Sequence, residues 1–122
     1  NKASIINISS TRAKMSQPQG ETYSMAKGAI SSLTHALAQS LSGKVRVNTV
    51  LPGWIDTEFI EYSGSDAKQH TSGRVGNPKD ISDLVLYLCS DKAGFINGQE
   101  FIVDGGMSTT MIYSGDGGWS LE

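Results

Sequence analysis

Hydrophobic and polar positions along the chain predict three strands separated by two helices. Residues 3–8 carry three isoleucines with little alternation, a pattern typical of a parallel strand that is covered on both faces. From Lys44 to Leu51 apolar and polar residues alternate, which predicts a second strand. Between them, the stretch from Tyr23 to Leu41 predicts a helix, because apolar residues recur there at helical spacing: Ala26, Ala29, Ile30, Leu33, Leu37 and Leu41.

The second half of the chain predicts one more helix and one more strand. Asn77 has the side chain of a helix N-cap, Pro78 suits the first helical position, and Asp80 lies close to the exposed N–H groups. The helix continues with four apolar residues on one face: Ile81, Leu84, Val85 and Leu88. After a turn at residues 97–98, residues 100–103 predict the third strand. Residues 55–76 show only a weak pattern, and we expect one or two short helices in a mobile segment.

The alternation of strand, helix, strand, helix and strand indicates the α/β class, with about three parallel strands and flanking helices. Ligands of such sheets bind beyond the carboxyl ends of the strands. The first strand ends at Ser9-Ser10, the second at Pro52-Gly53 and the third at Gly105-Gly106. Polar and small residues therefore gather at the edge where a binding site is expected.

Composition narrows the possible partners and the location. The 122 residues suit one domain, and a net charge of -2 gives no electrostatic reason to bind nucleic acid or an acidic membrane surface. No apolar run is long enough to span a bilayer, and the first ten residues lack the features of a secretion signal.

The single cysteine, Cys89, follows an apolar helical pattern, and we interpret it as buried and reduced, which favours a cytoplasmic location. Because Asn1 is not a methionine and the first strand starts almost at once, the chain is interpreted as a piece of a longer protein.

The two histidines do not indicate a metal site. His35 falls within a predicted helix and His70 in a polar loop, and neither has a second ligand at metal-binding spacing. Both are interpreted as surface or packing residues, and no metal is expected.

Tyr23 and Lys27 are the candidate residues for chemistry. They stand four positions apart on one predicted helix, so their side chains are neighbours on one face. An ordinary tyrosine titrates near pH 10, about three units too high for a general base at neutral pH, and a nearby ammonium group favours the phenolate. A hydroxyl at the first strand's end, such as that of Ser10, could hold a carbonyl or alcohol oxygen while Tyr23 passes the proton. Redox chemistry of this kind also needs a hydride, which no side chain supplies.

Each of these residues also has a plain structural interpretation. Any amphipathic helix can contain Tyr-x-x-x-Lys, and Ser10 could simply cap a turn. The residues alone therefore leave the enzymatic interpretation open.

Five stretches together resemble the classical subgroup of the short-chain dehydrogenase/reductase family. They are IINISS (5–10), YSMAK (23–27), RVNTVLPGWIDT (46–57), GRVGNPKDISDLVLYLCSD (73–91) and INGQEFIVDGG (96–106). They follow the family's order and spacing, with Ser10 thirteen residues before Tyr23. The resemblance covers nearly all of the chain but only the C-terminal half of a family subunit, and it implies the C-terminal part of a Rossmann-type doubly wound parallel sheet. Residues 1–106 would form this half-domain, and residues 107–122 a glycine-rich tail or inter-subunit arm.

The resemblance also implies roles for particular residues. Tyr23 would be the acid/base, Ser10 would orient the substrate oxygen, and Lys27 would hold the nicotinamide ribose and favour the phenolate. The cofactor would be NAD or NADP, bound by Tyr23 and Lys27 together with a segment after the second strand: Pro52, Gly53, Ile55 through its backbone, and Thr57. The substrate pocket would be lined by Ser10 and three apolar residues: Trp54, Phe59 and Ile60. The substrate would be a small alcohol or carbonyl compound.

Parts of the family pattern do not occur in this sequence. The glycine-rich phosphate turn is missing, as is the residue that distinguishes NAD from NADP, so the choice of nucleotide cannot be read. The resemblance further implies a homo-oligomer, a dimer or tetramer, formed through the helix of residues 23–41 and the last strand.

Three functions follow from these observations. The first is an NAD(P)-dependent oxidoreductase that interconverts an alcohol and a carbonyl compound, present here as a part that is inactive by itself. The second is a non-catalytic assembly module that keeps the fold and the contact surface. The third is an epimerase or dehydratase, which shares Tyr-x-x-x-Lys, although the PGWIDT and FIVDGG segments count against it.

Overall fold

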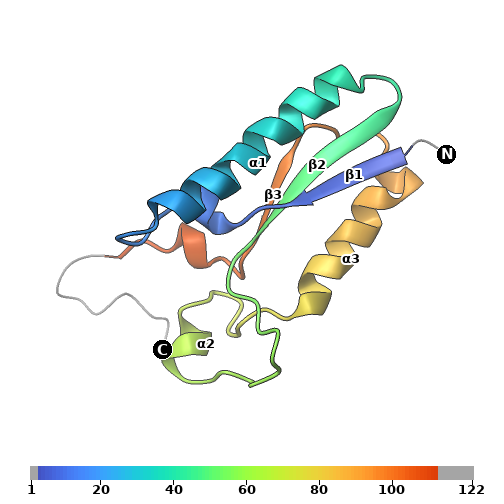
Figure 1. The fold of residues 1–122 in the computed structure, drawn as a ribbon. Helices are drawn as coiled ribbons and strands as arrows, with labels where there is room; N and C mark the ends of the chain where they lie inside the picture. Colours follow the sequence, from blue (N-terminus) through green and yellow to red (C-terminus); the bar gives the residue numbers. More distant parts are fainter. Residues whose placement is uncertain (1–2, 113–122) are drawn as a thin grey trace.

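The computed structural model describes residues 3–112, and these form a three-stranded parallel sheet with strand order β1-β2-β3 (Figure 1). Its strands and helices are β1 (Ala3–Ile8), α1 (Glu21–Ser40), β2 (Val45–Pro52), α2 (Ser65–Lys68), α3 (Pro78–Cys89) and β3 (Glu100–Val103). Three short 3-10 turns complete the described elements: η1 (Thr11–Ala13), η2 (Asp91–Ala93) and η3 (Met107–Thr109). The predicted α/β class and the order of the elements are confirmed.

The helices cover opposite faces of the sheet, α1 on one side and α3 on the other (Figure 1). On the α3 side, Val50 and Leu88 are fully buried together with Ala93. On the α1 side, the Asn7 amide donates to Thr34 Oγ1 at 3.0 Å, which joins β1 to the helix. α1 begins at Glu21, two residues before the predicted start.

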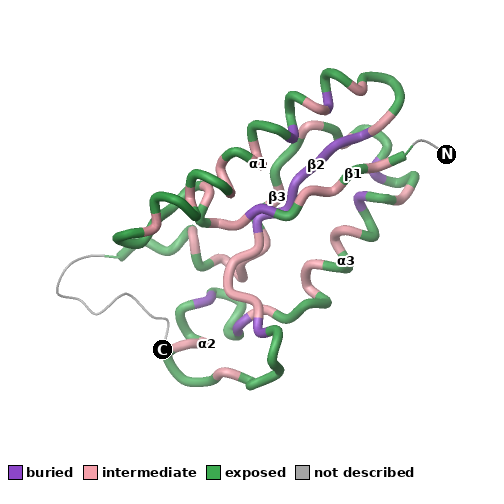
Figure 2. The backbone as a smooth tube through the Cα atoms, in the orientation of Figure 1, coloured by how far each residue is buried: buried purple, intermediate pink, exposed green. Residues whose placement is uncertain are grey.

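β2 is the central strand, and burial is concentrated along it (Figure 2). Its residues 46–51 are all buried, including the polar side chain of Asn48, which is fully inaccessible. The amide of Asn48 donates to Ile96 O at 3.1 Å and accepts from Gln99 N at 3.0 Å. A buried amide must be paired in this way, so Asn48 fixes the turn that leads into β3.

β1 has only part of the two-sided cover that its isoleucines predict: Ile6 packs against the core on the α3 side and Asn7 contacts α1, but two isoleucines are exposed. In the described part of the chain it pairs with β2 alone, and Ile5 and Ile8 are 37% and 45% exposed. In the described part of the chain β1 is the edge strand of the sheet, with no further strand beside it.

The prediction of a buried Cys89 is wrong, because its side chain is exposed. Leu88 points into the core, and the next helical residue is turned by about 100° from it. The apolar pattern of α3 therefore ends at Leu88, and a cytoplasmic location loses the support of a buried thiol.

The segment between β2 and α3 forms a loop whose two ends are joined by a β-bridge. Ile55 and Gly76 form an isolated parallel bridge, in which Asp56 N donates to Gly76 O at 2.8 Å and Gly76 N donates to Trp54 O at 3.1 Å. One short helix, α2, lies within this loop, as predicted. Its expected mobility stays a prediction.

Two further findings concern the whole described range. Within residues 3–112, no helix has both the length and the apolar content that crossing a bilayer requires. The predicted tail of residues 107–122 is described only as far as residue 112, and the rest lies outside the described residues.

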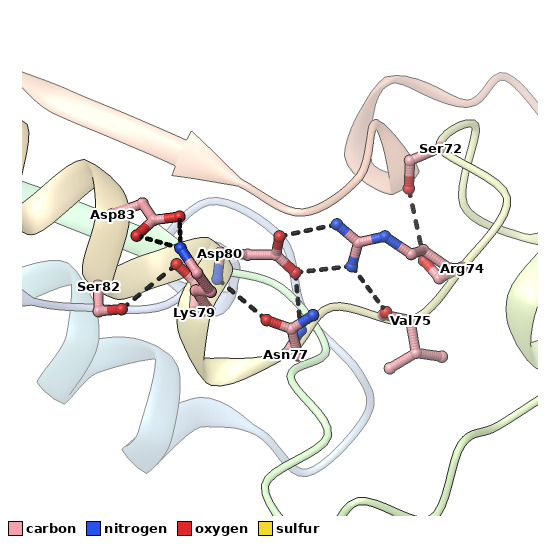
Figure 3. Close-up of polar contacts among 8 residues, drawn as sticks. All are labelled: Ser72, Arg74, Val75, Asn77, Lys79, Asp80, Ser82 and Asp83. Carbon is pink, nitrogen blue, oxygen red and sulfur yellow. Dashed lines mark hydrogen bonds and ion pairs between the residues drawn. The ribbon is translucent and has the colours of Figure 1, made fainter.

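The start of α3 is held by a predicted cap and by an ion pair that the sequence pattern did not indicate. Asn77 accepts from Asp80 N at 3.2 Å, while the Asp80 carboxylate accepts from Asn77 N at 2.8 Å. Both Nη atoms of Arg74 donate to the same carboxylate at 2.7 Å, and the exposed pair of Lys79 and Asp83 lies next to it (Figure 3). The Arg74 guanidinium lowers the pKa of Asp80 from 3.8 to about 2, against the opposing effect of burial.

We expect this ion pair to make unfolding pH-dependent in acid. Because the pKa of Asp80 is depressed in the folded state, its stabilisation is complete above the ordinary value of 3.8 and is lost as the pH falls through about 2. The Arg74 side chain is 54% exposed, so solvent screening keeps the contribution of the pair small. Arg74→Gln should lower the free energy of unfolding at pH 7 slightly and make its decrease in acid less steep, as measured by urea unfolding.

Lys79→Gln is the matched control, because it removes an exposed i,i+4 pair worth at most about 0.5 kcal/mol. An Arg74→Gln profile as steep as that of the unmodified chain would show that the ion pair of Arg74 and Asp80 does not carry the acid dependence.

Candidate active site

A cavity of about 430 Å³ lies at the carboxyl ends of the strands, and both Ser10 and Tyr23 line it. Its lining comes from the segment after β1, the start of α1, the end of β2 and the turn after β3: Ser10, Thr11, Arg12, Met15, Ser16, Gln17, Tyr23, Gly53, Trp54, Asp104, Met107 and Ser108. Four of the predicted site residues, namely Ser10, Tyr23, Gly53 and Trp54, therefore meet in one hollow.

Ser10 is a cap, and its hydroxyl still has a proton to donate. Its Oγ accepts from Arg12 N at 3.1 Å and so begins the η1 turn. A hydroxyl both accepts and donates, so the cap uses an acceptor site and leaves the O–H donor available to the cavity. The neighbouring Ser9 is buried, and its hydroxyl donates to Lys27 O at 2.8 Å, which fixes the end of β1 against α1.

Two positive side chains lie close to the Tyr23 ring. Lys27 Nζ is 5.7 Å from the centroid of the phenol ring, and Arg12 Cζ is 5.4 Å from it. Lys27 Nζ also donates to Ile8 O over a long 3.5 Å. Tyr23 is 45% exposed and lines the cavity, whereas Lys27 is not among the lining residues.

The segment after β2 approaches the turn after β3 very closely. Gly53 N donates to Val103 O at 2.9 Å, and a Cβ at Gly53 would lie 2.5 Å from the Cβ of Asp104. The bridge between Ile55 and Gly76 uses the N–H of Asp56 and the C=O of Trp54. In a parallel ladder this leaves the N–H and C=O of Ile55 itself outside the bridge.

Several predicted site residues lie away from the cavity. Pro52 ends β2, Thr57 is exposed, and Phe59 and Ile60 are 73% and 54% exposed, with none of them in the cavity wall. Phe59 has a φ of 59°, which is uncommon for a bulky residue.

A buried carboxylate holds this loop in place. Asp56 Oδ1 accepts from Glu58 N at 3.1 Å and Oδ2 accepts from Glu61 N at 3.0 Å. Burial raises the pKa of Asp56, but these and neighbouring backbone N–H groups prevail and lower the pKa below its ordinary value.

The sequence prediction missed the charged residues of the cavity, Arg12 and Asp104, and placed Met107 and Ser108 in a tail. Asp104 caps the turn after β3, because its carboxylate accepts from Gly106 N at 2.9 Å and from Ser108 N at 2.8 Å. Burial raises the pKa of Asp104, while these hydrogen bonds lower it, with a net downward shift. The signal that could have found Asp104 is its place before two glycines at a strand end.

The histidines differ from each other in burial. His35 is exposed on α1, whereas His70 is only 2% exposed, with Nδ1 2.9 Å from Asp66 O. Within residues 3–112, His70 Nε2 has no hydrogen-bond partner, and no three side chains of the metal-ligating types lie close enough to hold an ion.

Comparison with known proteins gives one consistent family. Residues 1–108 match the family model of enoyl-(acyl carrier protein) reductase. A protein of Thermotoga maritima described as an uncharacterized oxidoreductase is 50% identical over 89% of this chain and 47% of its own length. The structure of an apo SCOR enzyme from Clostridium thermocellum is 51% identical, with a TM-score of 0.87 over 98% of this chain and 47% of that one.

A third relative was solved with a nucleotide. The structure of 4-hydroxyisoleucine dehydrogenase complexed with NADH is 33% identical, with a TM-score of 0.80 over 90% of this chain and 48% of that one. The chain thus spans about half the length of the relatives it matches.

The contact between Gly53 and Asp104 makes a prediction about stability. Gly53→Ala should lower the free energy of unfolding by about 1–3 kcal/mol, because the new methyl group meets the Asp104 Cβ and Cα at 2.5 and 2.9 Å. Gly28→Ala is the matched control within α1, where the nearest atom to a new Cβ is Ala13 O at 4.0 Å. In Gly28→Ala the free energy of unfolding should rise by about 0.5–1 kcal/mol, because alanine favours the helix over glycine. Thermal and urea unfolding of both variants would measure this, and equal effects would contradict the close approach.

Proposed function

Because the chain belongs to the short-chain dehydrogenase/reductase family, we propose that it carries the catalytic half of an NAD(P)-dependent oxidoreductase. The reaction is the interconversion of an alcohol and a carbonyl compound, with Tyr23 as the acid/base. The observation that carries the proposal is the common cavity of Ser10 and Tyr23, with the Lys27 ammonium 5.7 Å from the phenol ring.

The residues present fit the nicotinamide half of the cofactor. The Lys27 ammonium has three N–H donors, of which the described residues engage one, over 3.5 Å to Ile8 O. The remaining donors suit the hydroxyls of a ribose. The backbone of Ile55 suits a carboxamide, which needs both a donor and an acceptor, and the bridge with Gly76 leaves both groups of Ile55 unused. Pro52, Gly53 and Thr57 are proposed as further cofactor contacts, and the choice between NAD and NADP stays open.

In the direction of reduction, the Ser10 hydroxyl donates a hydrogen bond to the substrate carbonyl oxygen and holds it near Tyr23. Tyr23 gives its proton to this oxygen as the negative charge develops there. The bound nicotinamide supplies the hydride. The positive charge of Lys27 stabilises the phenolate that Tyr23 leaves behind, and in oxidation the phenolate takes the proton back.

We propose that the carbon chain of the substrate contacts residues of the segment after β2. Trp54 lines the cavity directly. Phe59 and Ile60 belong to a loop whose base is fixed at the bridge of Ile55 and Gly76, and we propose that they reach the substrate only when this loop closes over the cavity.

The alternative of a non-catalytic assembly module explains the fold but not the cavity. A module needs only an exposed contact surface, whereas this chain places an O–H donor and a phenol in one hollow beside two cations. The cytoplasmic location stays a prediction.

The catalytic role is tested by Tyr23→Phe. Turnover is measured on the complete product of the gene that encodes these residues, with alcohols and ketones and the absorbance of reduced nicotinamide. Loss of the phenol oxygen should lower kcat by about 10²–10⁴, the usual contribution of a general acid/base. Tyr87→Phe is the matched control, because Tyr87 is also 45% exposed but lies on α3. Unchanged turnover in Tyr23→Phe would refute the proposal, and a gene product that associates without turnover would favour the assembly module.

We also propose that copies of the chain associate through α1 and β3. Met25, Ala29 and Leu33 are exposed and recur every four residues, so they form one apolar stripe on α1. On β3, Ile102 is 47% exposed.

Leu33→Glu should shift the protein from a dimer or tetramer towards the monomer in sedimentation velocity experiments, because a charge in an apolar contact is desolvated without a partner. Ile60→Glu is the control, since Ile60 is similarly exposed, 54% against 50%, but lies in the loop. Equal masses for Leu33→Glu and the unmodified protein would place the contact elsewhere.

A further inference from the structure

Arg12 brings a positive charge into the cavity that contains Ser10 and Tyr23. Its side chain forms part of the wall, with Cζ 5.4 Å from the Tyr23 ring centroid. Its backbone N–H is tied to Ser10 Oγ, so the position of the arginine and that of the serine hydroxyl are linked.

The charge of Arg12 has no acidic partner among the described residues. The ion pairs of residues 3–112 use Lys14, Arg74 and Lys79 instead. The Arg12 guanidinium makes one hydrogen bond there, from Nη2 to Gln17 Oε1 at 2.6 Å. A guanidinium has five N–H donors, so most of its donors remain available to a ligand.

The single carboxylate in the cavity wall forms no ion pair with Arg12. The two carboxylate oxygens of Asp104 instead accept hydrogen bonds from Gly106 N and Ser108 N, at 2.9 and 2.8 Å. The remaining lining is neutral and combines hydroxyl and amide groups with the apolar side chains of Met15, Trp54 and Met107. The cavity therefore offers one open cationic group, an apolar wall, and the proposed proton donor.

On the premise of the proposed oxidoreduction, we infer that the substrate carries a carboxylate and that Arg12 binds it, so that the site interconverts an oxo acid and a hydroxy acid. The planar guanidinium matches the two oxygens of a carboxylate. Because Arg12 and Tyr23 are close neighbours, the carboxylate lies only a few bonds from the reacting carbonyl. The alkyl end of the acid packs on Trp54 and the methionines.

The test measures binding, which needs no turnover. The complete product of the gene that encodes these residues is labelled with ¹⁵N, and the indole N–H resonance of Trp54 is followed during titration with 2-oxobutanoate or with its uncharged methyl ester. The acid should bind about tenfold more tightly than the ester, the usual effect of a charge-assisted hydrogen bond at a partly exposed site. Arg12→Gln should abolish the difference in affinity between acid and ester. Arg12→Lys should keep part of this difference, because lysine keeps the positive charge but lacks the two parallel N–H donors of the guanidinium.

Lys92→Gln is the matched control. It removes one positive charge from the exposed η2 turn, beyond the last turn of α3 and outside the cavity. The acid should keep its preference in this variant. Equal affinities for acid and ester, an unchanged preference in Arg12→Gln, an equal loss in Lys92→Gln, or no binding of either compound would each overturn the inference.

Turnover of the complete gene product separates this inference from the proposed function. If the protein binds the acid through Arg12 but converts neither the acid nor the ester, the proposed oxidoreduction is wrong and the proposed carboxylate site at Arg12 stands. A protein that reduces the ester as readily as the acid, with the ratio of kcat/KM unchanged in Arg12→Gln, would refute the carboxylate site and leave the oxidoreduction.

Discussion

The structure depends on β2, a strand that is paired on both edges and buried along residues 46–51. Such a strand can contain polar residues only if each finds a partner. Asn48 binds the turn before β3, Thr49 Oγ1 donates to Asn7 O at 3.0 Å, and Arg46 donates to the carbonyls of Leu88 and Ser90 at 2.8 and 3.2 Å. The polar side chains of β2 thus fix β1, the end of α3 and the entry to β3.

The parallel pairing of the three strands then determines where chemistry can occur. Parallel strands end at the same edge, so the residues after β1, β2 and β3 meet there. Gly53 lets the segment after β2 pass against Asp104 at a distance that no side chain would allow. The capped turns at Ser10 and Asp104 satisfy local backbone N–H groups and thereby hold the cavity wall in a defined shape.

Much of the fold was predictable from local pattern. The bounds of β1 and β3, the cap of α3 at Asn77 and the closeness of Tyr23 to Lys27 depend on neighbours in sequence, and they agree with the structure. The exposure of Cys89 and of β1 could not be predicted in this way, because burial depends on which elements cover a residue. Arg12 and Asp104 were missed for a similar reason, since only the meeting of three strand ends places them in one cavity.

Two positively charged side chains lie beside the phenol ring that lines the cavity. Lys14, Arg74 and Lys79 are each paired with a carboxylate, and buried Arg46 is paired with the carbonyls at the end of α3, where the helix dipole is negative. Arg12 and Lys27 have no carboxylate partner in the described part of the chain, and both lie within 6 Å of the same phenol ring. Negative charge that develops on the phenol oxygen or on a bound substrate would be attracted by both cations, so this arrangement suits a site that works with negative charge.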